Sequence, residues 1–296
     1  MNVKAGGLQR PLHFVIAAAA ALGLLLVLVQ AGHWLSTSAP VRDALAAGSL
    51  AALATALGAV PIVVVKKLNP RVNDSLLGLG AGVMLAATCF SLIVPALDTA
   101  GEGRGPWASS LIVGAGLLLG AFFLMVMEHL TPHVHVVAPD RQDASDLQRV
   151  RRLWLFVFAI VLHNVPEGLA IGVATAGTDA AHATALTTGI AIQDVPEGLV
   201  VALALLSAGL RKLPALLISA ASGLVEPLAA VLGAAALGYS APLLPWGLAF
   251  AGGAMLFVVS HEIIPESHRQ GHERFATAGL VCGFVLMMIL DTALTA

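Results

Sequence analysis

The sequence predicts an all-α, polytopic membrane protein, and three observations point to that fold class. Of its 296 residues, 58% are apolar and only 11% are charged, whereas a soluble domain carries about 25% charged residues. The mean hydropathy is +0.91. Uncharged runs are long, and residues 13–41 contain no Asp, Glu, Lys or Arg. A β-barrel would need alternating ten-residue segments, which this sequence lacks, so we expect helices.

Nine segments are long enough to cross a hydrocarbon core of about 30 Å, which takes about 20 helical residues. They are residues 13–32, 43–65, 75–97, 107–130, 153–176, 183–208, 214–238, 243–264 and 275–295. We expect residues 1–41 to form a cytoplasmic segment and an extra helix, and residues 42–296 to form an eight-span domain with a cytoplasmic loop at about 131–152. Residues 29–31 resemble a signal-cleavage site, but the apolar stretch exceeds the usual signal core, which favours a retained helix.

The basic residues predict the orientation of the chain. Alternate loops hold only Arg42 and Arg104, and the other 13 of the 15 Lys and Arg residues lie on the opposite side of the predicted spans. Basic residues concentrate in cytoplasmic loops. We therefore expect an integral protein of the cell (inner) membrane, with the N-terminus in the cytoplasm and the C-terminus outside.

Other features restrict the function classes. A net charge of −2 argues against nucleic-acid binding, and two cysteines in apolar runs, Cys89 and Cys282, exclude a disulfide scaffold. The G-x-x-x-G at Gly116 and Gly120 suits close helix contacts, but the pattern is common in glycine-rich spans and leaves a homodimer open. Because all loops are short, any function should be carried out within the lipid bilayer.

Four carboxylates lie near the middle of three predicted spans, where hydrocarbon should exclude them. They are Glu167, Asp194, Glu197 and Glu226. An ionised side chain at that depth costs about 3 kcal/mol on insertion scales, so four cost about 10 kcal/mol. No Lys or Arg lies inside any predicted span to pair with them. Protons, water or bound cations must supply the compensation.

Two of these spans repeat one polar pattern thirty residues apart, HNVPEG at 163–168 and QDVPEG at 193–198. At about 100° per residue, its first, second and fifth positions share one helix face. Consecutive spans run antiparallel, so the two strips predict inverted symmetry with a site at the interface. Pro166 and Pro196 free backbone carbonyls one turn earlier, and we expect both helices to kink there.

Each feature alone has an ordinary explanation, since a proline can simply kink a helix and an amide can join two helices. Together the features predict a cation site, and the ligand types select the ion. Imidazole, carboxylate and amide groups suit Zn²⁺, Fe²⁺, Mn²⁺, Cd²⁺ or Co²⁺, whereas the lack of thiolates argues against Cu⁺. Seven candidate ligands exceed what one ion needs, so we expect two ions that share Glu167 and Glu197. The seven are His163, Asn164, Glu167, Gln193, Asp194, Glu197 and Glu226.

The motifs HNVPEG, QDVPEG, SGLVEP and SHEIIPESH resemble the bacterial form of the ZIP (Zrt/Irt-like) family of divalent metal transporters. The resemblance covers about residues 42–296, an eight-helix core, and leaves one extra N-terminal helix. It implies that His163, Glu167, Gln193 and Glu197 line one metal site, with Met84 as a soft ligand. It also implies that Asn164, Asp194 and Glu226 join the two glutamates at an adjacent site.

The resemblance further implies import of metal into the cytoplasm by an elevator-type motion. The moving helices would be 43–65, 153–176, 183–208 and 214–238. The metal, Zn²⁺ or a similar ion, is then the transported substrate, and no organic cofactor is expected. The histidine-rich loop of many members is reduced here to His129, His133 and His135.

Acidic and histidine residues near the span ends suggest where ions enter and leave. Asp98 and Asp291 are expected at an outer mouth, where two acids would attract cations. Glu128, His261 and Glu262 are expected at an exit or regulatory metal site, and the resemblance supports this, since family members bind metal at the residues matching His261 and Glu262.

Two other functions compete with metal transport. An intramembrane metal-dependent hydrolase or protease would need an open coordination position and a free base, but H-E-x-x-H is absent and nearly every polar group is committed to ligation. A monovalent-cation or proton carrier needs carboxylates only, so His163 and two amides would be surplus. We therefore expect a transporter, not an enzyme.

Overall fold

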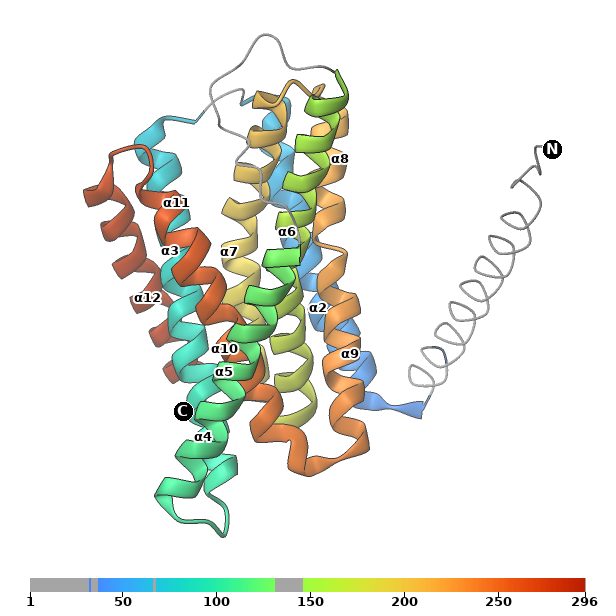
Figure 1. The fold of residues 1–296 in the computed structure, drawn as a ribbon, viewed down its shortest axis with the longest axis vertical. Helices are drawn as coiled ribbons and strands as arrows, with labels where there is room; N and C mark the ends of the chain where they lie inside the picture. Colours follow the sequence, from blue (N-terminus) through green and yellow to red (C-terminus); the bar gives the residue numbers. More distant parts are fainter. Residues whose placement is uncertain (1–31, 33–36, 66–67, 131–145, 296) are drawn as a thin grey trace, which may run out of the picture.

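The structure is a computed structural model that describes residues 32, 37–65, 68–130 and 146–295. Every regular element in these residues is a helix, and the helices stand side by side in a bundle (Figure 1). Seven of the described helical stretches are long and apolar enough to cross a membrane, which confirms the polytopic helical bundle. Residues 13–31 of the first expected span and residues 131–145 of the expected loop lie outside the described residues.

The elements follow the predicted spans closely. In chain order they are α2 (Ala39–Ala59), η1 (Val60–Val63), α3 (Pro70–Ala87), η2 (Thr88–Ile93), α4 (Val94–Gly101), α5 (Pro106–Leu130), α6 (Asp146–Gly177), α7 (Ala180–Ser207), α8 (Lys212–Ser222), α9 (Val225–Tyr239), η3 (Ala241–Leu243), α10 (Leu244–Val258), η4 (Val259–Ile263), α11 (Ile264–His268) and α12 (Glu273–Thr295). Helix α6 begins at Asp146, so the chain is already helical in the last part of the segment expected as a loop.

One predicted span is broken in the middle. The segment expected as a single helix at 214–238 consists of α8 and α9, which are separated at Gly223 and Leu224. Pro227 explains the break, because its ring has no N–H and would clash with the carbonyl of Gly223 four residues earlier. Helices α6 and α7 run without interruption through Pro166 and Pro196, so the expected kinks do not divide either helix.

Two π-helical segments lie in α3–α4 and α10–α11. Segment η2 leads into Pro95 and carries Ser91, while η4 leads into Pro265 and carries His261 and Glu262. A π-helical turn is uncommon and occurs frequently at functional sites. Both segments hold polar side chains that face partners described below.

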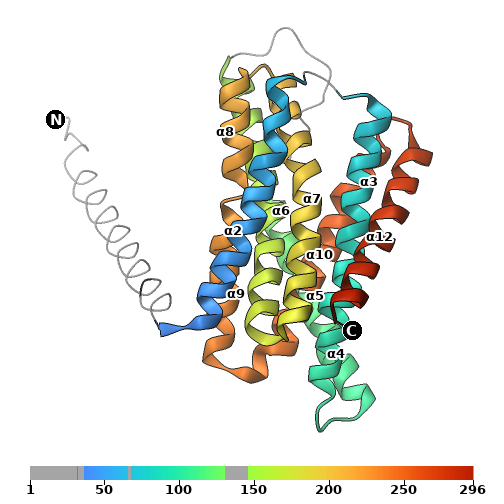
Figure 2. The same ribbon diagram turned by 180° about the vertical axis from the view of Figure 1, so that it is seen from behind.

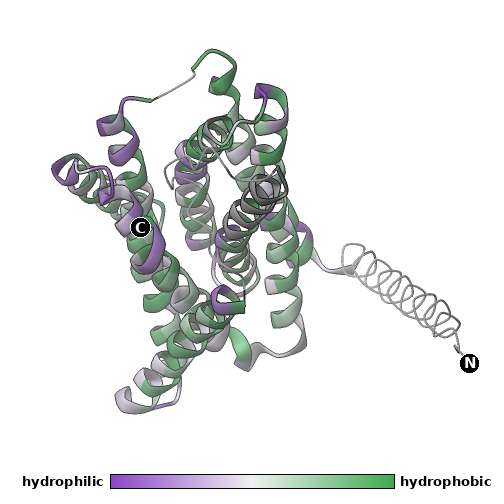
Figure 3. Cartoon of the chain, turned by 45° about the horizontal axis from the view of Figure 1, so that its top comes forward, coloured by the Kyte–Doolittle hydropathy of each residue, from purple (hydrophilic) through white to green (hydrophobic). Residues whose placement is uncertain are grey.

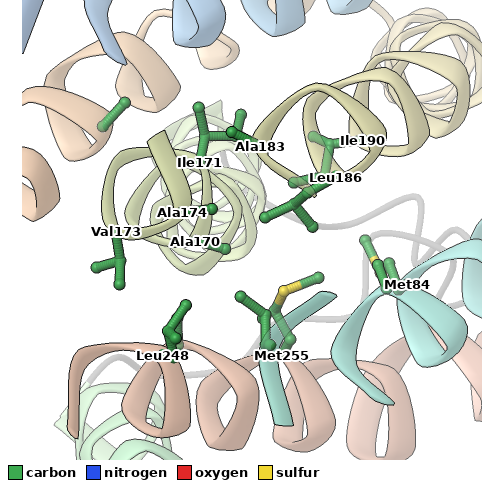
Figure 4. Close-up of a cluster of buried hydrophobic side chains, with 14 of the residues drawn as sticks. Met84, Ala170, Ile171, Val173, Ala174, Ala183, Leu186, Ile190, Leu248 and Met255 are labelled. Carbon is green, nitrogen blue, oxygen red and sulfur yellow. The ribbon is translucent and has the colours of Figure 1, made fainter. Parts of the chain in front are cut away.

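The helices pack as two groups. The first group contains α2, α6, α7, α8 and α9; the second contains α3, α4, α5, α10, α11 and α12. The most extensive helix contacts, such as α2 with α7 and α3 with α12, lie inside a group, and Figure 2 shows α3 and α12 side by side. Between the groups, aliphatic side chains of α6 and α7 face Met84 of α3 and Leu248 and Met255 of α10 (Figure 4).

The connection between α6 and α7 fixes their relative direction. Only Thr178 and Asp179 separate the two helices, so they run antiparallel, as predicted. The Asp179 carboxylate accepts hydrogen bonds from the backbone N–H groups of Ala181 and His182, at 2.9 and 3.0 Å, and caps α7. Hydrophobic residues cover most of the helix bodies (Figure 3), as expected for contact with lipid.

Candidate metal centre

The repeated strips of α6 and α7 meet at the middle of the bundle. One carboxylate oxygen from each of Glu167, Asp194 and Glu197 lies within 4.8 Å of the other two. Asp194 is fourteen residues beyond the start of the span at Ala180, which places it about 21 Å along the helix. Three acids therefore converge near the centre of a membrane span, where an uncompensated charge is costly.

Gln193 holds two of these acids by one oxygen each. Its amide Nε2 donates a short hydrogen bond to Oε1 of Glu167 and a longer one, 3.5 Å, to Oδ1 of Asp194. Oε2 of Glu167 and Oδ2 of Asp194 are buried and accept no hydrogen bond from the described part of the chain. Each carboxylate thus keeps one oxygen available for a ligand.

Glu226 extends the cluster from the break between α8 and α9. It lies in the first turn of α9 and is fully buried, and the N-terminal end of a helix stabilises negative charge. Its Oε1 accepts hydrogen bonds from Thr55 Oγ1 at 3.2 Å and from Asn164 Nδ2 at 3.3 Å. Its Oε2 is buried without a hydrogen-bond partner among the described residues.

Within this cluster, five buried oxygens are left without hydrogen bonds from the described residues. They are Asn164 Oδ1, Glu167 Oε2, Gln193 Oε1, Asp194 Oδ2 and Glu226 Oε2. A buried polar atom without a partner costs about 1–3 kcal/mol, more if charged, so native proteins rarely retain several together. Carboxylate and amide oxygens are ligands for divalent ions, so these five atoms are candidate metal ligands.

A small cavity borders the cluster on the α3 side. Met84 of α3 lines it together with Gln193 and Glu197 of α7. Met84 is buried and also belongs to the apolar core between the helix groups. Its position beside two predicted ligands is compatible with the soft-ligand role that the resemblance implies.

His163 lies in α6, one helical turn before Glu167, and is paired with another carboxylate. Its Nε2 is 2.8 Å from Oε2 of Glu262, which η4 supplies. This contact joins the two helix groups, because α6 belongs to the first group and η4 to the second. The candidate exit residue Glu262 therefore contacts the candidate site directly.

The other expected exit residues form a second pair. His261 Nε2 lies 3.0 Å from Glu128 Oε1, and the His261 ring stacks on Phe257 with centroids 5.1 Å apart. His261 and Glu262 are neighbours in η4, so the structure brings all three expected exit residues to one region at the ends of α5 and α10.

The two expected entrance acids differ in environment. Asp98 is exposed on α4, whereas Asp291 of α12 is only 8% exposed and accepts a 2.6 Å hydrogen bond from Ser91 in η2. Asp291 is therefore a buried, hydrogen-bonded carboxylate and not a solvated helix end. This hydrogen bond joins α12 to the π-helical segment η2 within the second group.

Comparison with known proteins identifies the family. The family model described as ZIP zinc transporter matches residues 137–291, which include both repeated strips and Glu226. The zinc transporter ZIPB of Bordetella bronchiseptica is 47% identical over 290 residues, covering 97% of this chain and 93% of the relative. The chain belongs to the ZIP zinc transporter family.

Two further ZIP relatives support this membership across distant organisms. The zinc transporter GufA of Myxococcus xanthus is 45% identical and covers 84% of this chain and 98% of the relative. The human zinc transporter ZIP11 is 32% identical and covers 81% of this chain and 94% of the relative. The family expected from the motifs is thus confirmed.

Two hydroxyl groups at the proposed ZIP metal path were missed by sequence reasoning. Thr55 contacts Glu226 and Ser91 contacts Asp291, yet both lie in stretches that read as ordinary apolar spans. Nothing in their local sequence distinguishes them from helical Ser and Thr residues that bond their own backbone. Only the three-dimensional packing shows that these hydroxyl groups donate hydrogen bonds to the acids.

Proposed function

We propose that this ZIP protein transports Zn²⁺ across the membrane through a binuclear site in the middle of the bundle. The five buried oxygens without hydrogen bonds, on α6, α7 and α9, are the observation that carries this proposal. The names of the relatives, which are zinc transporters, support zinc as the substrate. Fe²⁺, Mn²⁺, Cd²⁺ and Co²⁺ suit the same ligand types and are alternative substrates.

The arrangement of the ligands suggests how they are divided. Glu226 and Asn164 are hydrogen bonded to each other, and we assign them with Asp194 to the second ion. Gln193, Glu197 and Met84 line one cavity, and we assign them with His163 to the first ion. Glu167 and Glu197 are shared by both ions. Two ions offer four positive charges to four carboxylates, which removes the cost of burying uncompensated acids.

An elevator-type motion of the first helix group against the second would move these ions. Close packing at glycines supports the division of the bundle into two helix groups that each move as a unit. A Cβ on Gly198 would lie 2.1 Å from the Thr55 carbonyl oxygen inside the first group, and one on Gly82 would lie 1.9 Å from the Leu280 carbonyl oxygen inside the second. Backbones in such contact move as one body.

Among the described residues, Gly177 and Gly189 at the interface between the groups have side-chain atoms as the nearest neighbours of an added Cβ. The atom nearest to a Cβ on Gly189 is Met287 Sδ, and the atom nearest to one on Gly177 is Leu244 Cδ1. Much of that interface is a cluster of buried apolar side chains (Figure 4), and the His163–Glu262 contact is a polar link across it. Flexible apolar contacts can exchange partners, whereas the backbone contacts inside each group cannot, so sliding is expected between the groups.

We infer import into the cytoplasm from the charge distribution. The basic loops at one end of the bundle indicate the cytoplasmic side of the cell (inner) membrane, and Glu128, His261 and Glu262 lie at that end as exit residues. Asp291 and Asp98 lie toward the opposite end and would attract cations to the entrance. His163 connects the midplane site to the exit residues, because it pairs with Glu262.

Zinc flux into liposomes that contain the purified protein tests this function. We expect wild-type protein to move Zn²⁺, and Glu167→Ala or Glu197→Ala to stop it. Glu102→Ala is the matched control, because it removes an exposed acid outside the bundle centre. Unchanged flux in both site variants would refute the midplane site. Uptake competed by Na⁺ but not by the other divalent ions would favour a monovalent-cation carrier, and cleavage of a membrane peptide would favour a hydrolase.

A further inference from the structure

We infer that Thr55 is a positioning residue for the second metal ion, an inference that rests on the proposed function. Thr55 lies on α2, which contributes none of the predicted ligands, and its side chain is 1% exposed. Its Oγ1 donates to Oε1 of Glu226 at 3.2 Å, with a weaker contact of 3.4 Å to the carbonyl of Ala51. A buried hydroxyl usually bonds only its own helix, but this one reaches a residue 171 positions away.

The hydrogen bond determines which carboxylate oxygen is free. Oε1 of Glu226 accepts from both Thr55 and Asn164, and Oε2 is left buried with no hydrogen-bond partner among the described residues. Asn164 is itself a candidate ligand through its free Oδ1, so its amide must accommodate an ion. Thr55 is not a candidate metal ligand, so its hydroxyl group need not accommodate an ion. It is therefore the donor that can keep Oε1 bonded while Oε2 binds metal.

The backbone of Thr55 is fixed by two glycines. A Cβ on Gly198 would come within 2.1 Å of the Thr55 carbonyl oxygen, and a Cβ on Gly223 would come within 3.0 Å of the Thr55 Cβ. Gly198 ends the repeated strip of α7, and Gly223 lies at the break before Glu226. The same close contacts join α2 to α7 and to the break before α9, and they hold the Thr55 hydroxyl in place. Rotation of the Glu226 carboxylate would break its hydrogen bond to Thr55.

The expected effect is a loss of affinity at one of the two sites. Removing an outer partner of a metal ligand lowers metal affinity by about 10–100-fold. We expect Thr55→Val, which keeps the shape but removes the hydroxyl, to weaken the second Zn²⁺ by about that factor and to leave the first unchanged. Thr55→Ser keeps the hydroxyl and should restore wild-type affinity.

Calorimetric titration of the purified full-length protein in detergent with Zn²⁺ tests this inference. Ser49→Ala is the matched control, because that hydroxyl lies on α2 and, among the described residues, donates to the Leu45 carbonyl of its own helix at 2.6 Å. Selective weakening of one site in Thr55→Val, with rescue by Thr55→Ser, is the expected result. Thermal unfolding without metal is measured in parallel, so that a variant that is merely destabilised is recognised.

Three outcomes would overturn the inference. Wild-type affinity at both sites in Thr55→Val would show that the hydroxyl does not position Glu226. Equal weakening at both sites, together with a lower unfolding temperature without metal, would show that Thr55 has a packing role only. Failure of Thr55→Ser to rescue would exclude the hydroxyl as the cause. By contrast, absence of zinc binding to wild-type protein would refute the proposed function itself.

Discussion

Gly198→Ala introduces one methyl group where α2 and α7 touch, and its effect can be worked out from the structure. The new Cβ would lie 2.1 Å from the Thr55 carbonyl oxygen. Carbon and carbonyl oxygen approach to about 3.3 Å, so the two helices must separate by about 1.2 Å. Metal–ligand distances tolerate only about 0.2 Å, and a misplacement of about 1 Å can cost about 100-fold. We expect zinc affinity at the second site to fall by about that factor.

The fold itself should survive this substitution. Overpacking costs about 1–3 kcal/mol, and alanine recovers about 0.5–1 kcal/mol as a better helix former than glycine. The variant should therefore be recovered as folded protein with a slightly lower unfolding temperature. This keeps a loss of zinc binding interpretable as a change in ligand geometry.

Gly189→Ala is the control for this experiment. It adds the same methyl group to the same helix, and its Cβ would lie 2.2 Å from Met287 Sδ. The obstacle is the flexible end of a methionine side chain, which can change rotamer, so zinc affinity should stay at the wild-type value. Calorimetric titration with Zn²⁺ compares the two variants. Wild-type affinity in Gly198→Ala would refute the reasoning that the α2–α7 contact sets the ligand geometry.

Three further predictions concern residues around the centre. Glu262→Gln should strengthen zinc binding about tenfold, because the charge-assisted hydrogen bond between Glu262 and His163, of about 1.5–3 kcal/mol, no longer competes with zinc for His163. Weaker zinc binding in this variant would instead show that Glu262 holds His163 in place as a ligand. Asp291→Asn should raise the KM for zinc uptake several-fold and leave kcat unchanged. A changed kcat would contradict a role for Asp291 in cation entry alone. The backbone N–H of His182, together with its imidazole, lowers the pKa of Asp179 below 3.8. Since the folded pKa is depressed, the stabilisation by Asp179 is present at neutral pH and is lost as the pH falls below 3.8 through the folded value. Asp179→Ala should therefore cost about 1 kcal/mol at pH 7 and nothing measurable in strong acid, as followed by thermal unfolding; an equal difference at both pH values would contradict the capping role.

The hydrophobic pattern predicted the helices well, because a span must satisfy its own backbone in lipid. The ends of α5 and α7 differ from the predicted spans by three residues at most. The break between α8 and α9 was missed because hydropathy does not detect it. Gly223 and Pro227 were its signal, but Pro166 and Pro196 leave their helices continuous, so proline alone does not predict where a span divides.

The candidate site could be predicted to the level of its acids and amides. Repetition of the HNVPEG and QDVPEG strips placed Glu167, Asp194 and Glu197 on facing helices, and the structure brings them together. The pairing of His163 with Glu262 could not be predicted, because it depends on how the two helix groups pack. Contacts between residues far apart in the sequence are set by tertiary packing and leave no local pattern.

Anomalous X-ray scattering at the zinc edge, from crystals of the protein grown with Zn²⁺, tests the central claim most directly. The account predicts two zinc peaks between α6, α7 and the start of α9, about 3.5–4 Å apart as in other two-metal sites, with Glu167 and Glu197 bridging them. A single peak, or zinc bound only at the ends of the bundle, would contradict a binuclear transport site at the middle of the membrane.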